Sequence, residues 1–151
     1  MSEGYILKQA EKSLPLKWYY DQSQFDLEVS KIWADDWFYV THESALSEPL
    51  SFVTVEVSKY NILLLKDKDG KINSYFNTCS HRGSVLQKDS SGRLKSNLLV
   101  CPYHQWSYNA SNGDLVRTTS INDPKDFDKK SKCLTKVNLK IWNGLIFVNL
   151  N

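Results

Sequence analysis

The spacing of hydrophobic and polar positions changes once along the chain and divides it into two parts. In the first part, four apolar residues recur at helical spacing: Phe25, Val29, Ile32 and Trp33. We therefore predict an amphipathic helix over residues 23–35, with Asp21 or Ser23 as its N-cap and its apolar face packed against the protein. The first 20 residues mix polar and apolar positions, and we expect them to form an extended arm.

From residue 37 onward, the helical period gives way to short runs of β-branched and aromatic residues, which are typical of strands. The runs predict strands over residues 37–40, 52–57, 60–66, 72–76, 98–100, 107–109, 115–117, 137–142 and 145–150. Three dipeptides mark turns between strands: Asp69–Gly70, Asn112–Gly113 and Asn143–Gly144. The predicted fold class is therefore mainly β, with antiparallel strands behind a short N-terminal helical segment.

Two boundaries complete this organisation. We expect an arm and helix over residues 1–36 and one compact domain over residues 37–151, because a length of 151 residues suits a single domain. Residues 123–132 are polar and include one proline, which predicts a surface excursion from that domain.

The composition argues against several classes of protein. The chain has 19 basic and 17 acidic side chains, and a net charge of +2 does not indicate a nucleic-acid or membrane partner. No apolar run approaches the roughly 20 residues that a membrane span needs, and the N-terminal residues lack a signal-peptide pattern. Three cysteines do not form a disulfide framework, so we expect a reducing, cytoplasmic location.

Two segments combine a cysteine with a histidine at close spacing, and they carry the strongest chemical signal in the sequence. They are Cys79-Ser80-His81-Arg82-Gly83 and Cys101-Pro102-Tyr103-His104-Gln105-Trp106. We expect both to be loops, joined by a hairpin that turns at residues 91–92. Such a hairpin would bring together two thiolates and two imidazoles, from Cys79, His81, Cys101 and His104. This donor set suits zinc or an iron–sulfur cluster.

Three interpretations of these four residues compete. They are buried, hydrogen-bonded structural residues, or the ligands of a structural zinc, or the ligands of a [2Fe–2S] cluster with cysteines on one iron and histidines on the other. Zinc fingers and ribbons usually begin with a close pair of cysteines, whereas each close pair here joins a cysteine to a histidine. The pattern therefore favours the cluster.

The residues around these pairs resemble a known family. The strings Asn77-Thr78-Cys79-Ser80-His81-Arg82-Gly83 and Cys101-Pro102-Tyr103-His104-Gln105-Trp106-Ser107-Tyr108 resemble the N-terminal domain of the α subunit of Rieske non-heme iron oxygenases, the ring-hydroxylating dioxygenases and related monooxygenases. The helix that leads to Trp37 and the closing run at residues 142–149 are also similar. The resemblance implies a Rieske-type β-sandwich or barrel and a [2Fe–2S] Rieske cluster, with Cys79 and Cys101 on one iron and His81 and His104 on the other.

The resemblance also implies a function. The chain would take single electrons from a reductase or ferredoxin and pass them to a mononuclear iron, in an assembly that the family suggests is a homotrimer. That iron needs two histidines and a carboxylate, and His42 is the only histidine left. We therefore expect the catalytic domain on another chain or in a missing C-terminal part, and no independent oxygenase activity. A free-standing Rieske ferredoxin and a zinc-stabilised interaction module are the alternatives.

Several single residues carry narrower expectations. Gln105 stands where the commonest family pattern has glycine. Ser84 and Tyr103 stand where respiratory Rieske proteins carry disulfide cysteines, which indicates the low-potential class. Trp106 is expected to shield the cluster by packing. Arg82 would either dock an acidic partner or form an internal salt bridge, and the sequence does not decide between the two.

Overall fold

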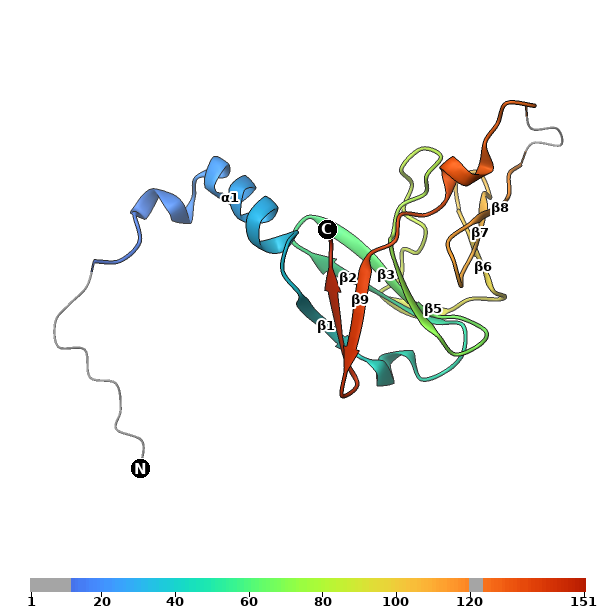
Figure 1. Ribbon diagram of the computed structural model, residues 1–151, viewed down its shortest axis with the longest axis horizontal. Coiled ribbons are helices and arrows are strands. Elements are labelled where there is room, and N and C mark those ends of the chain that lie inside the picture. Colours follow the sequence, from blue (N-terminus) through green and yellow to red (C-terminus); the bar gives the residue numbers. More distant parts are fainter. Residues whose placement is uncertain (1–11, 120–123) are drawn as a thin grey trace.

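Three small antiparallel sheets form the body of the protein in the computed structural model, which describes residues 12–119 and 124–151 (Figure 1). One sheet has the order β1-β10-β9, with bounds Phe38–His42, Leu145–Asn149 and Asn138–Trp142. The central sheet has the order β4-β3-β2-β5, with bounds Ile72–Phe76, Tyr60–Lys66, Ser51–Val57 and Ser91–Arg93. The last has the order β6-β7-β8, with bounds Leu98–Val100, Ser107–Asn109 and Leu115–Arg117. The mainly β prediction is confirmed.

Strand β3 lies between the two hydrophobic cores of the protein. Side chains alternate between the two faces of a strand, and all four central residues of β3 are fully buried. Leu63 and Leu65 join the core that also contains the two predicted cysteine ligands, whereas Ile62 and Leu64 join the core that packs on β1 and β10. The sheet that bears the site and the sheet that closes the chain are thus fixed to opposite faces of the same strand.

The hairpin expected at residues 91–92 between the two ligand loops is wrong. These residues belong to β5, which pairs with β2, where Phe52 lies opposite Gly92. A Cβ atom on Gly92 would lie 2.8 Å from the Phe52 ring, closer than side-chain atoms approach. This glycine therefore allows a strand to pass over an aromatic ring.

The N-terminal arm begins with a 3₁₀ turn at Leu16–Tyr19, and α1 (Gln22–Glu28) continues into a π-helical turn at Val29–Trp33. Asp21, one of the two predicted caps, is the N-cap, and its carboxylate accepts hydrogen bonds from the backbone N–H groups of Ser23 and Gln24. The extended arm expected before residue 20 falls partly outside the described residues, and the described part includes the 3₁₀ turn. No helix among the described residues is long and apolar enough to cross a membrane.

The predicted packing of the helix is wrong for most of its apolar face, although Trp33 stacks on Phe38 of β1 with ring centroids 4.9 Å apart. Of its apolar face only Val29 is buried, while Phe25, Ile32 and Trp33 are 44%, 46% and 36% exposed. Figure 1 shows the reason, because the arm projects away from the sheets.

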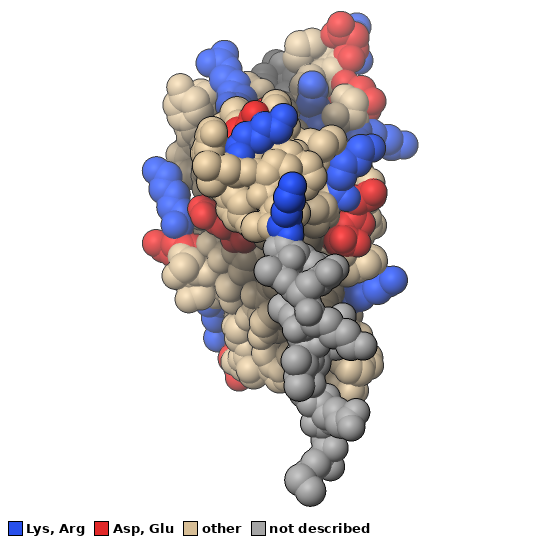
Figure 2. All heavy atoms as spheres, turned by 90° about the vertical axis from the view of Figure 1, so that its left-hand side faces the viewer, with Lys and Arg blue, Asp and Glu red and all other residues tan. Residues whose placement is uncertain are grey.

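Viewed from the arm's side, the surface carries lysines and arginines interspersed with acidic side chains rather than gathered into one patch (Figure 2).

Gly113, in the predicted turn at Asn112–Gly113, packs against the core and allows the tightness of that contact to be tested. Gly113 and Gly70 have nearly the same backbone φ, +81° and +85°, but a Cβ on Gly113 would lie 2.7 Å from the Tyr75 ring, whereas a Cβ on Gly70 meets nothing. The Tyr75 ring cannot easily move, because it is buried and its hydroxyl donates to Ala110 O at 3.1 Å.

We therefore expect Gly70→Ala to cost about 1 kcal/mol of stability through backbone strain alone. Gly113→Ala should cost a further 1–3 kcal/mol or so through overpacking. Urea unfolding of the two variants measures the difference. Equal costs for the two substitutions would contradict the tight contact with Tyr75.

Candidate metal centre

The two ligand loops repeat the same backbone hydrogen bonds. In the first loop, Cys79 N–H donates to Ser84 O at 2.8 Å and Gly83 N–H donates back to Cys79 O at 3.0 Å. In the second loop, Cys101 N–H donates to Trp106 O at 2.8 Å and Gln105 N–H donates to Cys101 O at 2.9 Å. The residue four positions after each cysteine thus closes the turn.

This repeat explains the unusual residue at position 105. Gly83 and Gln105 occupy the same place in their loops, and both have a positive φ, +70° and +56°. A non-glycine residue in this left-handed region is strained. Gln105 therefore adopts the backbone conformation that the usual glycine would adopt, with its side chain exposed to solvent.

Asn77 fixes both ends of the first loop. It is fully buried, and its side-chain amide donates to Asn61 Oδ1 and to Gln87 O, both at 2.7 Å, while its Oδ1 accepts from Gln87 N–H at 3.0 Å. Buried amides without partners are costly, so the three hydrogen bonds hold this geometry firmly. The sequence motif included Asn77 but did not indicate this role.

The structure brings the four predicted ligands together as two like pairs. Cys79 and Cys101 are 2% and 1% exposed. The pKa of the Cys79 thiol is raised, mainly because the thiol is buried and to a lesser extent because Cys101 is hydrogen-bonded to it. His81 and His104 are only partly buried, with ring centroids 4.8 Å apart. The thiols therefore lie deep in the core, and the imidazoles lie at its surface.

A hydrogen-bond chain joins the buried thiol to a distant segment. Ser80 Oγ donates to Lys132 O at 2.6 Å, and the Tyr108 hydroxyl lies 3.0 Å from both Ser80 Oγ and Cys79 Sγ, so its one proton is shared between these two acceptors. Burial raises the pKa of Tyr108, which keeps this donor protonated. The backbone N–H of His81 also bonds to the Cys79 sulfur and lowers the pKa of that thiol, which opposes the effect of burial.

Aromatic rings cover one side of the imidazole pair. The Trp106 ring stacks on His81 at 4.4 Å and 10°, and Phe127 meets Trp106 edge-on at 5.8 Å. Trp106 is nearly buried, in agreement with its predicted packing role. The segment predicted at residues 123–132 is described from residue 124, and it is not simply a surface excursion, because Phe127 packs on the core beside the site.

A model of the Rieske [2Fe-2S] domain matches residues 36–135 of the chain. The chain belongs to the Rieske [2Fe-2S] domain family. Family members bind a two-iron cluster through two thiolates on one iron and two imidazoles on the other. The paired thiols and paired imidazoles of this structure fit that group, and membership selects the cluster over the zinc interpretation.

The curated relatives of this Rieske domain include oxygenase subunits. The carnitine monooxygenase oxygenase subunit of Escherichia coli (strain K12) is 30% identical over 92% of this chain and 36% of its own length. The glycine betaine monooxygenase oxygenase subunit of Pseudomonas aeruginosa (strain PAO1) is 31% identical over 91% of this chain and 31% of its own length. The chain therefore spans about a third of the length of these relatives.

Solved structures show the same Rieske-type fold. The apo form of CntA, a quaternary ammonium Rieske monooxygenase, superposes with a TM-score of 0.85 at 29% identity, over 92% of this chain and 40% of that one. Naphthalene 1,2-dioxygenase with bound indole gives a TM-score of 0.80 at 26% identity, over 88% of this chain and 30% of that one.

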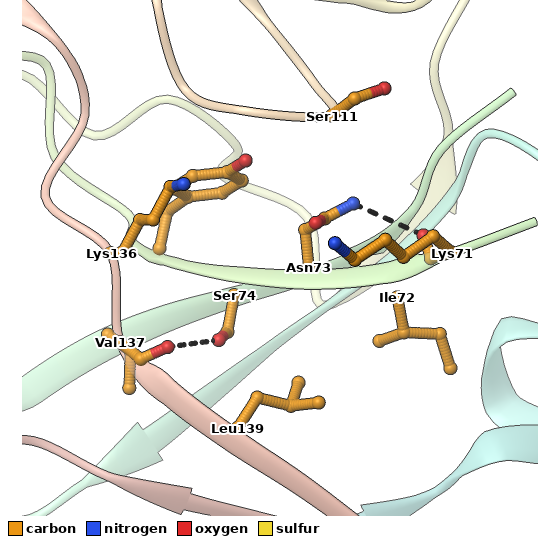
Figure 3. Close-up of a pocket in the computed structure, with 9 residues that line it drawn as sticks. Lys71, Ile72, Asn73, Ser74, Ser111, Lys136, Val137 and Leu139 are labelled. Atoms are coloured by element: carbon orange, nitrogen blue, oxygen red, sulfur yellow. Dashed lines mark hydrogen bonds between the residues drawn. The ribbon is translucent and has the colours of Figure 1, made fainter. Parts of the chain in front are cut away.

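Other candidate positions lie apart from the two loops. His42 Nδ1 accepts from Ser44 N–H at 3.1 Å and caps a 3₁₀ turn at Glu43–Leu46, which gives this exposed histidine a structural role. Across residues 12–119 and 124–151, no group of three or more His, Cys, Asp or Glu side chains is placed to hold a single metal ion. A hollow of about 260 Å³ beside β4, between Lys71 and Lys136, contains none of the predicted ligands (Figure 3).

The Tyr108 hydroxyl should tune the reduction potential of the Rieske cluster. A hydrogen bond to a ligand sulfur stabilises the reduced, more negative state. We expect Tyr108→Phe to lower the potential by about 40 mV, which corresponds to about 1 kcal/mol for one electron. Protein-film voltammetry measures the change. The matched control is Tyr103→Phe at an exposed tyrosine, and a potential that falls equally in both variants would contradict the role of Tyr108.

Proposed function

We propose that Cys79 and Cys101 bind one iron of the Rieske [2Fe–2S] cluster and that His81 and His104 bind the other. The observation that carries this assignment is the placement of the two thiols as one buried pair and the two imidazoles as a second pair nearer the surface. When bound, the cluster supplies one-electron chemistry. The domain then passes single electrons towards a mononuclear iron on another domain or chain.

The buried residues around the thiols and the partly buried imidazoles have different roles in this electron transfer. The core around the thiols excludes water, and the Tyr108 hydroxyl and the His81 backbone N–H donate hydrogen bonds to the Cys79 sulfur. The imidazoles are only partly buried, so their outer edges offer a short route between the buried site and a docked partner. The two loops thus hold the donor atoms in a fixed arrangement that needs little adjustment when an electron arrives.

The arm supports a permanent partner. Large apolar side chains that follow closely in sequence along it are exposed, among them Leu16 at 75% and Tyr20 at 76%, and apolar surface gathered in this way marks an interaction site. We propose that residues 1–36 form the N-terminal arm and helix and residues 37–151 the Rieske domain, and that the exposed apolar side chains of the described part of the arm pack on the catalytic domain. The family match, which begins at residue 36, supports this boundary.

The relatives support an electron-carrying role that is independent of substrate. Proteins named for the oxidation of carnitine and of naphthalene share this domain with the present chain. One similar quaternary ammonium Rieske monooxygenase, with a TM-score of 0.82, was solved in a study of inter-subunit electron transfer. We therefore propose a homotrimer in which the mononuclear iron belongs to a neighbouring chain, and a reductase or ferredoxin as the electron donor.

The cysteines support a reducing, cytoplasmic setting for the protein. All three are free thiols in the structure. Two of them serve the proposed cluster, which requires deprotonated, reduced sulfur. The third, Cys133, contacts Asp114 Oδ1 at 3.5 Å and belongs to neither loop.

Metal and sulfide content tests the cofactor directly. We expect the chain, purified anaerobically, to contain two irons and two acid-labile sulfides, because a [2Fe–2S] cluster has that composition. Its reduced form should give the electron paramagnetic resonance signal of a Rieske centre. Stoichiometric zinc without sulfide would contradict the proposal.

The proposed ligands can be tested one at a time. We expect His104→Ala to abolish the visible Rieske absorption and the resonance signal, because it removes one of four donors to the cluster. His42→Ala is the matched control, since His42 caps a turn away from the two loops. A Rieske spectrum that survives in the His104 variant would show that the ligand set is misassigned.

A further inference from the structure

We propose that Arg82 and Lys132 form a cationic rim beside the two imidazoles, and that this rim docks the acidic face of the redox protein that donates electrons. This inference rests on the proposed function, because it concerns the partner of the same site. It also takes up the docking alternative that the sequence left open for Arg82. The contacts of the two residues carry the argument.

Arg82 is held at a fixed position next to His81. It lies within the turn that Gly83 N–H closes by donating to Cys79 O, and its own side chain is exposed. Within the part of the chain that the structure describes, the one ion pair joins Lys68 to Asp69. The guanidinium group therefore has no internal carboxylate partner there and faces solvent.

Lys132 comes from a distant part of the chain but is tied to the same place. Its carbonyl accepts the 2.6 Å hydrogen bond from Ser80 Oγ, and Phe127 of the same segment packs against Trp106, which stacks on His81. These contacts fix the backbone of Lys132 beside the first ligand loop, close enough for its positive charge to act on His81. The rim is thus built from two segments that meet only in the fold.

The charges near the imidazoles have one sign. After burial and the neighbouring His104 ring, the groups that lower the pKa of His81 are Arg82 and Lys132, whose side chains are both cationic. The acidic residues of the same segment are directed elsewhere or lie at its exposed margin: Asp128 accepts from Lys130 N–H at 2.9 Å as a helix cap, and Asp126 is exposed.

The neighbouring lysines do not belong to the rim. Lys129 and Lys130 line a separate hollow together with Asp114 and Cys133. The mixed charges on the arm's side of the molecule also contrast with the single sign found here (Figure 2). A local field of one sign thus surrounds the site of electron entry.

The centre of the proposed docking surface is apolar. The Tyr103 ring lies 3.8 Å from the His104 ring and is 63% exposed, and Pro102 and Val85 are exposed nearby in the two loops. An apolar centre with a charged margin is the usual anatomy of a protein interface. Electron-transfer encounters bury little area, so charge complementarity has a large influence on how often the partners meet.

The step itself is simple to balance. One electron leaves the reduced donor, which is oxidised by one unit, and the cluster is reduced by one unit. No bond forms or breaks, and no proton moves. Positive charges at the rim attract an acidic donor from solution and orient it over the imidazoles before that electron moves.

An acidic plant-type [2Fe–2S] ferredoxin is a suitable probe. Its binding to the cluster-loaded chain is measured by biolayer interferometry with both proteins oxidised, so that the readout does not depend on electron transfer. We expect the double variant R82E/K132E to lower the association rate constant about tenfold at low ionic strength. The difference should shrink as added salt screens the charges.

The matched control is K68E/K95E, which changes the net charge equally. Lys68 follows the far end of β3, whereas the first ligand loop is tied to Asn61 at the near end of that strand. The Lys68 N–H donates to Asn97 Oδ1, two residues after Lys95. We expect this variant to bind nearly as fast as the unchanged chain. An equal loss in both variants, or no loss in the rim variant, would overturn the proposal.

A second measurement separates this inference from the proposed function. Stopped-flow oxidation of the reduced protein by ferricyanide, an anion, should slow in R82E/K132E, whereas oxidation by the cation tris(phenanthroline)cobalt(III) should not. A Rieske spectrum recorded first shows whether the cluster is present in each protein. If the double variant does not assemble a cluster, the single variant K132E takes its place in the same measurement. Unchanged ferricyanide kinetics in K132E would then overturn the proposal.

Discussion

The placement of two thiols deep in the core, with two imidazoles above them, is the constraint on which the rest of the molecule depends. Each loop must turn sharply enough to direct its cysteine inward and its histidine outward. Both loops meet this demand with the same pair of backbone hydrogen bonds, closed by a residue of positive φ at Gly83 and Gln105. Exposed loops of this kind are mobile unless they are anchored, and the buried side chain of Asn77 supplies an anchor.

The central strand β3 connects this constraint to the remainder of the fold. Because its alternate side chains enter two different cores, a shift of register by one residue would disrupt the packing of the ligand loops and of the closing sheet together. Fully burying an aliphatic side chain of this size contributes roughly 1.5–3 kcal/mol. Four such residues in sequence therefore give the strand a strongly specified register, and the loops inherit that precision.

Sequence reasoning succeeded where the signal is local. The strands at Tyr60–Lys66 and Ile72–Phe76 were predicted with the observed bounds, because their β-branched and aromatic residues and the turn at Asp69–Gly70 define them. The four proposed cluster ligands followed from a motif. The failures concern contacts between distant residues. Gly92 was predicted to be a turn residue because its close contact with Phe52 is not visible in the sequence. The contacts of Tyr108 with Cys79 and of Phe127 with Trp106 have no signal in sequence spacing either. Helical periodicity likewise marks an apolar face of the arm without indicating what covers it.

Two surfaces that are exposed in the described part of the chain differ in a way that fits two kinds of partner. The arm presents large apolar side chains, and obligate interfaces are the more hydrophobic class, so it suits a domain that stays bound. Beside the imidazoles, the charges of Arg82 and Lys132 are positive, which suits a partner that must arrive quickly and leave again. Figure 1 places the arm on one side of the body and the sheet formed by β6, β7 and β8 on the other. A permanent and a transient partner would therefore not compete for the same surface, and an electron can enter the domain while the assembly remains intact.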